Sequence, residues 1–282
     1  MVTFPGNVTL SSLGLGTWRM GESPGRRKRE VAAVRAALDI GWRVIDTAEM
    51  YGDGGAEEVV GEAVGGALRA GALARENLFV VSKVYPHNAT ARGVVAACER
   101  SLGRLGLDHL DCYLLHWRGS VPLAETVAAF EGLRERGRIR HWGVSNFDVD
   151  DMDELLRVPA GENCAANQVL YNVTRRGPEF DLIPWMTEHR MPLMAYSPIE
   201  QGRLPRGGVL QRIGQKYGAS PFQIALAWLL QKPDVIAIPK ASSPDHVRDN
   251  HRALEIRLSP EDLDAIDAEF PTPRRKRPLE MI

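Results

Sequence analysis

Cysteine is scarce in this chain of 282 residues, and its pattern excludes several classes of protein. The three cysteines, Cys98, Cys112 and Cys164, lie far apart and are odd in number, so they indicate neither a disulfide framework nor a C-x-x-C pair. Reduced thiols in a cytoplasmic protein are the expectation. The net charge is only −1, so no binding to nucleic acid or to an anionic membrane is expected.

Long apolar runs are also missing. No window approaches 18 uncharged apolar residues, and residues 1–5 have neither the basic start nor the apolar run of a secretory signal. The rest is ordinary globular composition, with 44% hydrophobic and 25% charged residues. Because no linker or break in composition is visible, we expect one domain over residues 1–282, and we expect a monomer.

Short apolar strands alternate with amphipathic helices along most of the chain. Residues 2–4 and 8–10, separated by Pro5, Gly6 and Asn7, predict a small hairpin. Further strands are expected at residues 13–15, 44–46, 78–83, 110–115, 139–144, 165–168, 192–196 and 235–239. Helices are expected at residues 29–40, 57–68, 91–105, 122–136, 148–157, 180–190, 209–217, 221–231, from 243 onward and 260–269. We expect Asn88 to cap the helix over 91–105, and Asp148 and Ser243 to cap two others.

The pattern contains eight strand-then-helix units, and the strands are apolar on both faces, as in parallel sheets. An open doubly wound sheet and a closed barrel both fit such a pattern. The count of eight, the chain length and the lack of a Gly-x-Gly-x-x-Gly turn after the first strand favour the barrel. We therefore predict an α/β fold of the (β/α)8 TIM-barrel type, with a short N-terminal β-hairpin and an extra C-terminal helix.

Polar side chains follow seven successive barrel strands. They are Asp46, Lys83, His116, Ser145 with Asn146, Gln168, Tyr196 with Ser197, and Lys240. Each alone has an ordinary explanation: Asp46 could cap a strand, Lys83 could be solvated, and His116 could be a core histidine. Because the carboxyl ends of barrel strands converge on one face, their joint occurrence predicts a functional site there.

Several short motifs lie on these strand ends. They are GLGTW (14–18), DTA (46–48) with Tyr51 and Gly52, VSK (81–83), LLHW (114–117), GVSNF (143–147), NQ (167–168), AYSP (195–198) and IPK (238–240). In this order they resemble the motifs of the aldo-keto reductases, a family of (β/α)8 carbonyl reductases that use NAD(P)H. The resemblance covers nearly the whole chain. Through HWRGS (116–120) and PLEM (278–281), the chain is most similar to prokaryotic reductases of small aldehydes and 2-oxoaldehydes such as methylglyoxal.

Carbonyl reduction needs a hydride, which only a cofactor can supply, and a proton. The resemblance implies a tetrad in which Tyr51 is the acid and Lys83, Asp46 and His116 support it. A free phenol has a pKa of about 10. A cation about 4 Å away stabilises phenolate by about 4 kcal/mol, so Lys83 is expected to lower the pKa of Tyr51. Asp46 would keep Lys83 charged, and His116 would donate a hydrogen bond to the substrate carbonyl.

The resemblance also implies that NADP(H) is the cofactor. The residues implied to bind it are Gly16, Thr17, Ser145, Asn146, Gln168, Tyr196, Ser197, Ile199, Gln201, Lys240, Ser242, Ser243, His246, Arg248 and Asn250. Lys240 and the helix start at Ser243 form an anion site that suits the adenosine 2′-phosphate. Better-known members carry an arginine where this chain has His246. Arg248 either replaces that arginine or faces solvent.

Trp18, Trp117 and Tyr85 are expected to line a pocket for a small carbonyl substrate, with Trp42 a weaker candidate that core packing explains as well. The loop at 117–121 is short, and so is the tail after Phe270. Little chain is then left to cover the site, which predicts an open pocket and a broad range of aldehydes. The sequence identifies neither the physiological substrate nor the direction of the reaction in the cell.

Two other functions remain open. A reductase-like regulatory subunit would bind nucleotide without needing turnover. A metal-dependent barrel hydrolase would use Asp46 and His116 as ligands, but it needs further histidines or carboxylates at strand ends. This chain has serine, asparagine, glutamine and tyrosine there, so no metal site is expected.

Overall fold

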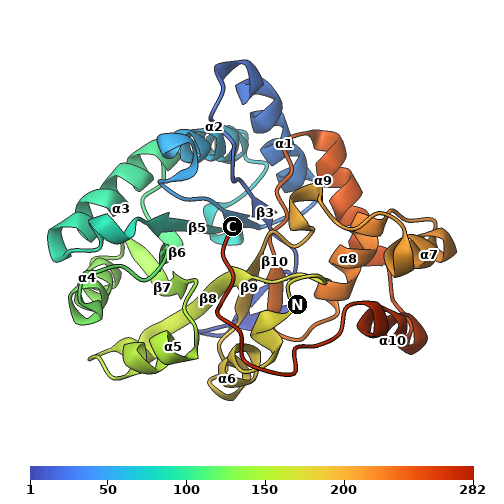
Figure 1. Cartoon of the computed structure of the whole chain (residues 1–282). Coiled ribbons are helices and arrows are strands. Elements are labelled where there is room, and N and C mark those ends of the chain that lie inside the picture. The colour runs from blue at the N-terminus through green and yellow to red at the C-terminus, as the bar shows by residue number, and fades with distance from the viewer.

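Eight parallel strands form a curled sheet at the centre of the computed structural model, which describes residues 1–282 (Figure 1). The strands are β3 (Leu15–Gly16), β4 (Val44–Asp46), β5 (Phe79–Val84), β6 (Leu110–Leu115), β7 (Ile139–Ser145), β8 (Cys164–Leu170), β9 (Leu193–Tyr196) and β10 (Val235–Ala237). Each strand pairs with the next in chain order. The first and last are joined because the N–H of Gly14 donates to Ala237 (2.9 Å) and that of Gly16 to Pro239 (3.1 Å). The sheet is therefore a closed barrel.

Ten helices surround the barrel, as Figure 1 shows for most of them. They are α1 (Arg27–Asp39), α2 (Gly55–Arg69), α3 (Ala91–Leu105), α4 (Leu123–Glu135), α5 (Val149–Leu156), α6 (Leu182–Glu188), α7 (Gly208–Tyr217), α8 (Pro221–Leu230), α9 (Pro244–His251) and α10 (Pro260–Glu269). None of these helices combines the length and the apolar character that crossing a bilayer requires. The predicted (β/α)8 fold with an extra C-terminal helix is confirmed.

The predicted hairpin is also present, as β1 (Val2–Phe4) paired antiparallel with β2 (Val8–Leu10). It closes the amino-terminal end of the barrel. Phe4 packs edge-on against Phe79 at the start of β5, with ring centroids 4.9 Å apart, and belongs to a cluster of 13 buried residues inside the barrel. A larger cluster of 66 buried residues fills the space between strands and helices. With one end plugged, the carboxyl ends of the strands are left to form a site.

Most predicted elements lie within one or two residues of their observed bounds, but one cap was wrong. Thr90 caps α3, because its hydroxyl accepts the N–H of Gly93 at 3.1 Å. Asn88 lies in the preceding 3-10 turn and donates its amide to Glu49 at 3.0 Å. The caps at Asp148 and Ser243 are confirmed.

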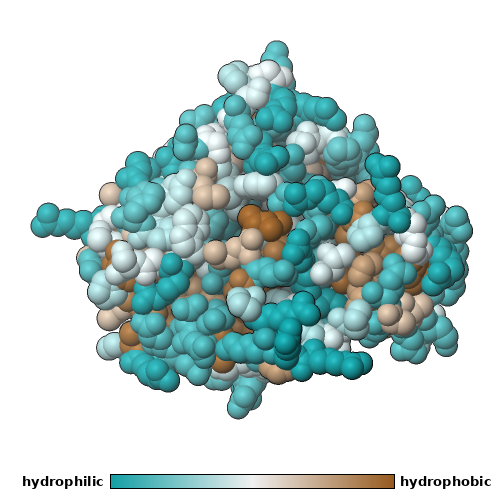
Figure 2. Space-filling view, in the orientation of Figure 1, coloured by the Kyte–Doolittle hydropathy of each residue, from teal (hydrophilic) through white to brown (hydrophobic).

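The C-terminal tail runs from α10 back across the mouth of the barrel and ends near its centre (Figure 1). Lys276 lies 3.4 Å from Asp150 and 3.5 Å from Asp181, and Glu280 pairs with Arg175 at 2.9 Å. A hydrophobic patch on this face lies close to where the chain ends (Figure 2). These ion pairs, together with the packing of Leu279 against the core, connect the tail to the barrel.

Candidate active site

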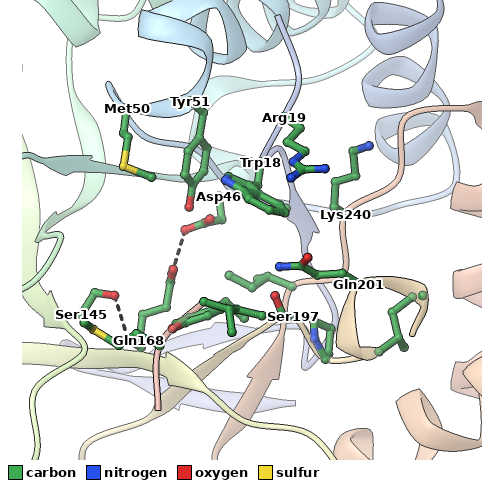
Figure 3. Close-up of a pocket in the computed structure, with 18 of the residues that line it drawn as sticks. Trp18, Arg19, Asp46, Met50, Tyr51, Ser145, Gln168, Ser197, Gln201 and Lys240 are labelled. Carbon is green, nitrogen blue, oxygen red and sulfur yellow. Dashed lines mark hydrogen bonds between the residues drawn. The ribbon is translucent and has the colours of Figure 1, made fainter. Parts of the chain in front are cut away.

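A cavity of about 750 Å³ opens at the carboxyl ends of the barrel strands. Residues from seven strand ends, α9 and the C-terminal tail contribute to its wall. The predicted site residues that line it are Gly16, Trp18, Asp46, Tyr51, His116, Trp117, Ser145, Asn146, Gln168, Tyr196, Ser197, Ile199, Gln201, Lys240, His246 and Asn250. Figure 3 shows Tyr51 and Asp46 pointing toward one another on one side, with Lys240, Arg19 and Gln201 on the other.

Lys83 lies beneath this cavity and is completely buried. Its Nζ donates to Asp46 Oδ2 at 2.8 Å, to the Thr47 carbonyl at 2.9 Å and to Tyr51 Oη at 3.1 Å. These bonds use all three ammonium hydrogens. Because Tyr51 accepts from Lys83, its own hydroxyl hydrogen is left for another acceptor, and Tyr51 lines the cavity.

Asp46 is held from two sides. Oδ2 accepts from Lys83, and Oδ1 accepts from Gln168 Nε2 at 2.8 Å. The carboxylate is 2% exposed, so a charge there needs such partners. The side-chain carbonyl of Gln168 remains without a protein donor at the cavity wall.

The expected lowering of the Tyr51 pKa is corrected by the structure. Burial raises the pKa of Tyr51 well above 10, and the charge of Asp46 raises it further. Lys83 does not reverse this, because Asp46 neutralises the ammonium at 2.8 Å and the phenol lies beside a balanced pair. Tyr51 is therefore a neutral hydroxyl that keeps its proton at neutral pH.

Lys83 and His116 are both affected by burial. Burial lowers the pKa of Lys83, and the neighbouring Asp46 opposes that change. Burial and the charge of Lys83 hold the pKa of His116 well below 6.5, so the imidazole is neutral at pH 7. Its ring centroid lies 5.8 Å from that of Tyr51, with the planes at 74°. A neutral imidazole with one N–H next to a phenol offers two hydrogen-bond donors to a single oxygen.

Ser145, Asn146 and Tyr196 form a connected group on the cavity wall. Asn146, in the left-handed region at φ 60°, donates to the His116 carbonyl and to Ser145 Oγ, both at 3.2 Å. It accepts from the Tyr196 hydroxyl at 2.9 Å. These bonds fix the Tyr196 ring against the cavity, where a flat aromatic ligand can stack on it.

The opposite end of the cavity is cationic. Lys240 makes one hydrogen bond, to Ser242 Oγ at 3.1 Å, and no ion pair, while burial lowers its pKa. Arg19 also lines the cavity, with its guanidinium carbon 4.4 Å from the centroid of the Trp18 ring. His246 and Asn250 of α9 complete this end. Two cations without carboxylate partners fit the phosphates of a dinucleotide.

Besides Lys83, five predicted site residues lie outside the cavity lining. Thr17 is buried and donates its hydroxyl to the Asp46 carbonyl at 2.9 Å. Ser242 contacts Lys240, and Ser243 caps α9. The other two are Arg248 and Tyr85.

Of the two alternatives for Arg248, replacing the family's arginine or facing solvent, the structure shows the second. Arg248 faces solvent and pairs with Asp245 at 2.6 Å. Tyr85 packs edge-on against Trp117 with ring centroids 5.9 Å apart. Tyr85 therefore packs behind Trp117, which lines the cavity. The weaker candidate Trp42 is buried away from the cavity and donates to His251 Nδ1 at 2.8 Å.

Several residues of the lining were not predicted from the sequence. Arg19, Met50, Phe222, Asp249, Met281 and Ile282 all contribute to it. Arg19 directly follows the GLGTW motif and could have been found by extending that strand end by one residue. The tail residues could not have been found in this way. The expectation that too little chain remained to cover the site is wrong, because Met281 and Ile282 reach the cavity.

The described residues contain no group of three or more histidines, cysteines or carboxylates placed to hold a metal ion. The side chains next to Asp46 are the Lys83 ammonium and the Gln168 amide, and the phenol of Tyr51 lies beside the His116 ring.

Comparisons with known proteins agree with this geometry. Methylglyoxal reductase YeaE of Escherichia coli is 50% identical over 100% of this chain and 99% of its own length. Glyoxal reductase of Bacillus subtilis is 36% identical over 93% of this chain and 89% of its own. A crystal structure of an aldo/keto reductase from Klebsiella pneumoniae in complex with NADP and acetate has a TM-score of 0.94 and 49% identity, covering 100% of this chain and 99% of that one. The model of the aldo/keto reductase family matches residues 12–269, and the chain belongs to that family.

Proposed function

We propose that this enzyme reduces aldehydes and 2-oxoaldehydes, with methylglyoxal as a representative substrate, at the expense of NADPH. The observation that carries the proposal is the contact of Lys83 Nζ with Asp46 at 2.8 Å and with Tyr51 at 3.1 Å, which leaves the Tyr51 proton available at the cavity. The names of the two bacterial relatives support the substrate class.

NADP(H) supplies the hydride when it is bound. Lys240 and Arg19 would hold its phosphates, with His246 and Asn250 beside them. Ser145, Asn146 and Gln168 would bond the carboxamide, and the ring of Tyr196 would support the nicotinamide. The Klebsiella structure in complex with NADP supports this choice of cofactor.

Tyr51 is the acid. Its hydroxyl donates to the substrate oxygen and releases the proton as negative charge develops there. The phenolate left behind is stabilised by the Lys83 ammonium, which already donates to the same oxygen. Asp46 keeps Lys83 charged. His116, neutral at pH 7, donates a second hydrogen bond and orients the carbonyl.

The decisive experiment follows the absorbance of NADPH with methylglyoxal as substrate. Tyr51→Phe is expected to lower kcat by a factor of about 10²–10⁴, because the proton donor is removed while the ring is kept. Tyr217→Phe, which removes a hydroxyl of α7 far from the cavity, serves as the matched control and keeps full activity.

Undiminished turnover by Tyr51→Phe would refute the mechanism. NADPH binding by the wild-type protein without turnover of any aldehyde would favour the regulatory subunit, and activity dependent on an added metal would favour the hydrolase.

We further propose that residues 1–282 form one domain and act as a monomer in the cytoplasm. The buried, unpaired thiols suit a reducing compartment, and few large hydrophobic side chains are exposed. Because the first and last strands of the barrel are paired, the chain cannot be divided into two segments that each have a complete hydrophobic core. We expect a single calorimetric unfolding transition, with equal calorimetric and van't Hoff enthalpies. Two separated transitions would contradict the single domain.

A further inference from the structure

A buried ion pair that the proposed mechanism does not use lies behind Lys83. Glu57 is completely buried; its Oε1 accepts from Ser82 Oγ at 2.6 Å and its Oε2 accepts from Arg104 Nε at 2.6 Å. The Arg104 side chain is 22% exposed. Ser82 precedes Lys83 on β5, so the two side chains leave opposite faces of that strand. The pair therefore lies between the barrel and its helices, directly behind the site.

The pair joins the elements that carry Tyr51 and Lys83. Glu57 lies in the first turn of α2, which directly follows the 3-10 turn Tyr51–Gly54. Gly54 has a φ of +90°, and a Cβ atom there would lie 2.5 Å from Arg104 Nε. The guanidinium thus packs against the backbone of the turn, while the carboxylate is bonded to β5 through Ser82. A shift of either charged group displaces the turn relative to the strand.

We propose that Glu57 and Arg104 are positioning residues for carbonyl reduction: they set the Tyr51 hydroxyl against the Lys83 ammonium and place a balanced pair of charges behind it. The inference rests on the proposed function, because it assigns the pair to the same reaction. Neither residue lines the cavity, so both act through Tyr51 and Lys83.

The charges make the inference specific. Four titratable groups lie around Lys83: Asp46 from β4, Tyr51 from the turn, Cys112 from β6 and His116 after β6. The charge of Glu57 from α2 acts on Lys83 from the other face of β5. Glu57 in turn faces Arg104, and its charge also acts on the uncharged Cys98 and Tyr113.

Burial lowers the pKa of Lys83, and the charge of Glu57 opposes that change. Removing the negative charge of Glu57 alone is therefore expected to make Lys83 give up its proton more readily. By the same Coulombic argument, removing the positive charge of Arg104 alone is expected to have the opposite effect.

The test is the pH profile of kcat/KM for NADPH-dependent reduction of methylglyoxal. Glu57→Gln keeps the shape and removes the charge. Its alkaline limb is expected to move to lower pH by roughly one unit, with kcat at pH 7 lowered about tenfold. Arg104→Gln is expected to move the limb to higher pH. Glu58→Gln, the exposed neighbour on α2 that pairs with Arg27, is the matched control and keeps the wild-type profile.

The double variant Glu57→Gln/Arg104→Gln removes both charges together, and its limb is expected near the wild-type position although kcat stays low. The double variant also tests the inference if either single variant does not fold. An alkaline limb of its kcat/KM profile that differs from the wild-type position would contradict the proposed balance of charges.

An alkaline limb of Glu57→Gln that coincides with that of Glu58→Gln overturns the inference, even if the melting temperature falls, because stability alone does not move a pH profile. If wild-type protein does not oxidise NADPH with methylglyoxal, the proposed function itself fails. Wild-type turnover with an unmoved limb overturns only the role of the pair.

Discussion

Lys83 illustrates which properties of a single side chain the sequence could predict. Its place at a strand end and its partnership with Asp46 follow from the order of strands, because β4 and β5 are neighbours in a parallel barrel. The direction of the Tyr51 pKa shift did not follow from the order of strands, since it depends on how deeply the phenol is buried. Burial depth depends on every element that covers a residue, and local sequence does not contain it.

Lys240 allows a direct test of cofactor preference. The single hydrogen bond of Lys240 to Ser242 leaves donors for the 2′-phosphate, a group that NADH lacks. Lys240→Ala is expected to raise the Kd of NADPH about 10- to 100-fold, the loss of one charge-assisted hydrogen bond, and to leave that of NADH nearly unchanged. Titration of protein fluorescence with each nucleotide measures both constants. An equal loss for the two nucleotides would contradict this assignment.

Helix ends show why local signals are sometimes ambiguous. Asn88 and Thr90 are both good N-cap residues two positions apart, so the sequence offers two starts for α3. The choice depends on Glu49, which is 39 positions from Asn88 and accepts its amide hydrogen bond. Caps without such a distant competitor, such as Ser243, could be predicted from sequence alone.

Asp262 connects α10 to α7 and carries a pH-dependent contribution to stability. It forms a capping box with Ser259 and accepts from Lys216 at 2.8 Å and Tyr217 at 2.6 Å. Burial alone would raise its pKa, but these hydrogen bonds prevail and lower the pKa of Asp262 from 3.8 to about 2. Because the folded value is the lower one, this stabilisation is complete above about pH 4 and is lost as the pH falls toward 2.

Asp262→Asn is therefore expected to lower the free energy of unfolding by about 1–2 kcal/mol at pH 7, and by much less at pH 2. Urea denaturation at the two pH values measures both differences. Asp264→Asn, which removes an exposed carboxylate of the same helix, is the control and leaves the midpoint unchanged. The same difference at pH 2 and pH 7 would argue against the carboxylate as the source.

Across the whole chain, contacts between distant segments are what the sequence could not predict. The motifs identify nearly every strand end of the barrel. The path of the tail, however, depends on ion pairs such as Lys276 with Asp150, which are 126 positions apart. Arginine and lysine runs usually indicate solvated chain, so nothing in residues 271–282 predicted a return to the cavity.

Deletion of Met281 and Ile282 is expected to widen the substrate range. Their side chains line the cavity but are 57% and 50% exposed, so they obstruct large ligands more than they bind them. We expect kcat/KM for aromatic aldehydes to rise about three- to tenfold, with methylglyoxal little affected. Steady-state kinetics on both substrates measure this. Parallel losses for the two substrates would mean that the tail contributes to catalysis.

The seam between Gly16 and Lys240 has a consequence for biosynthesis. A Cβ at Gly16 would lie 2.6 Å from the Ile238 carbonyl, so the first strand approaches the last as closely as backbones allow. Lys240 emerges beside that contact, which means that the nucleotide site exists only after the final strand has docked on the first. A chain still attached to the ribosome, with residues 235–240 unmade or inside the exit tunnel, therefore has no place for dinucleotide, and cofactor can protect only finished molecules from proteolysis.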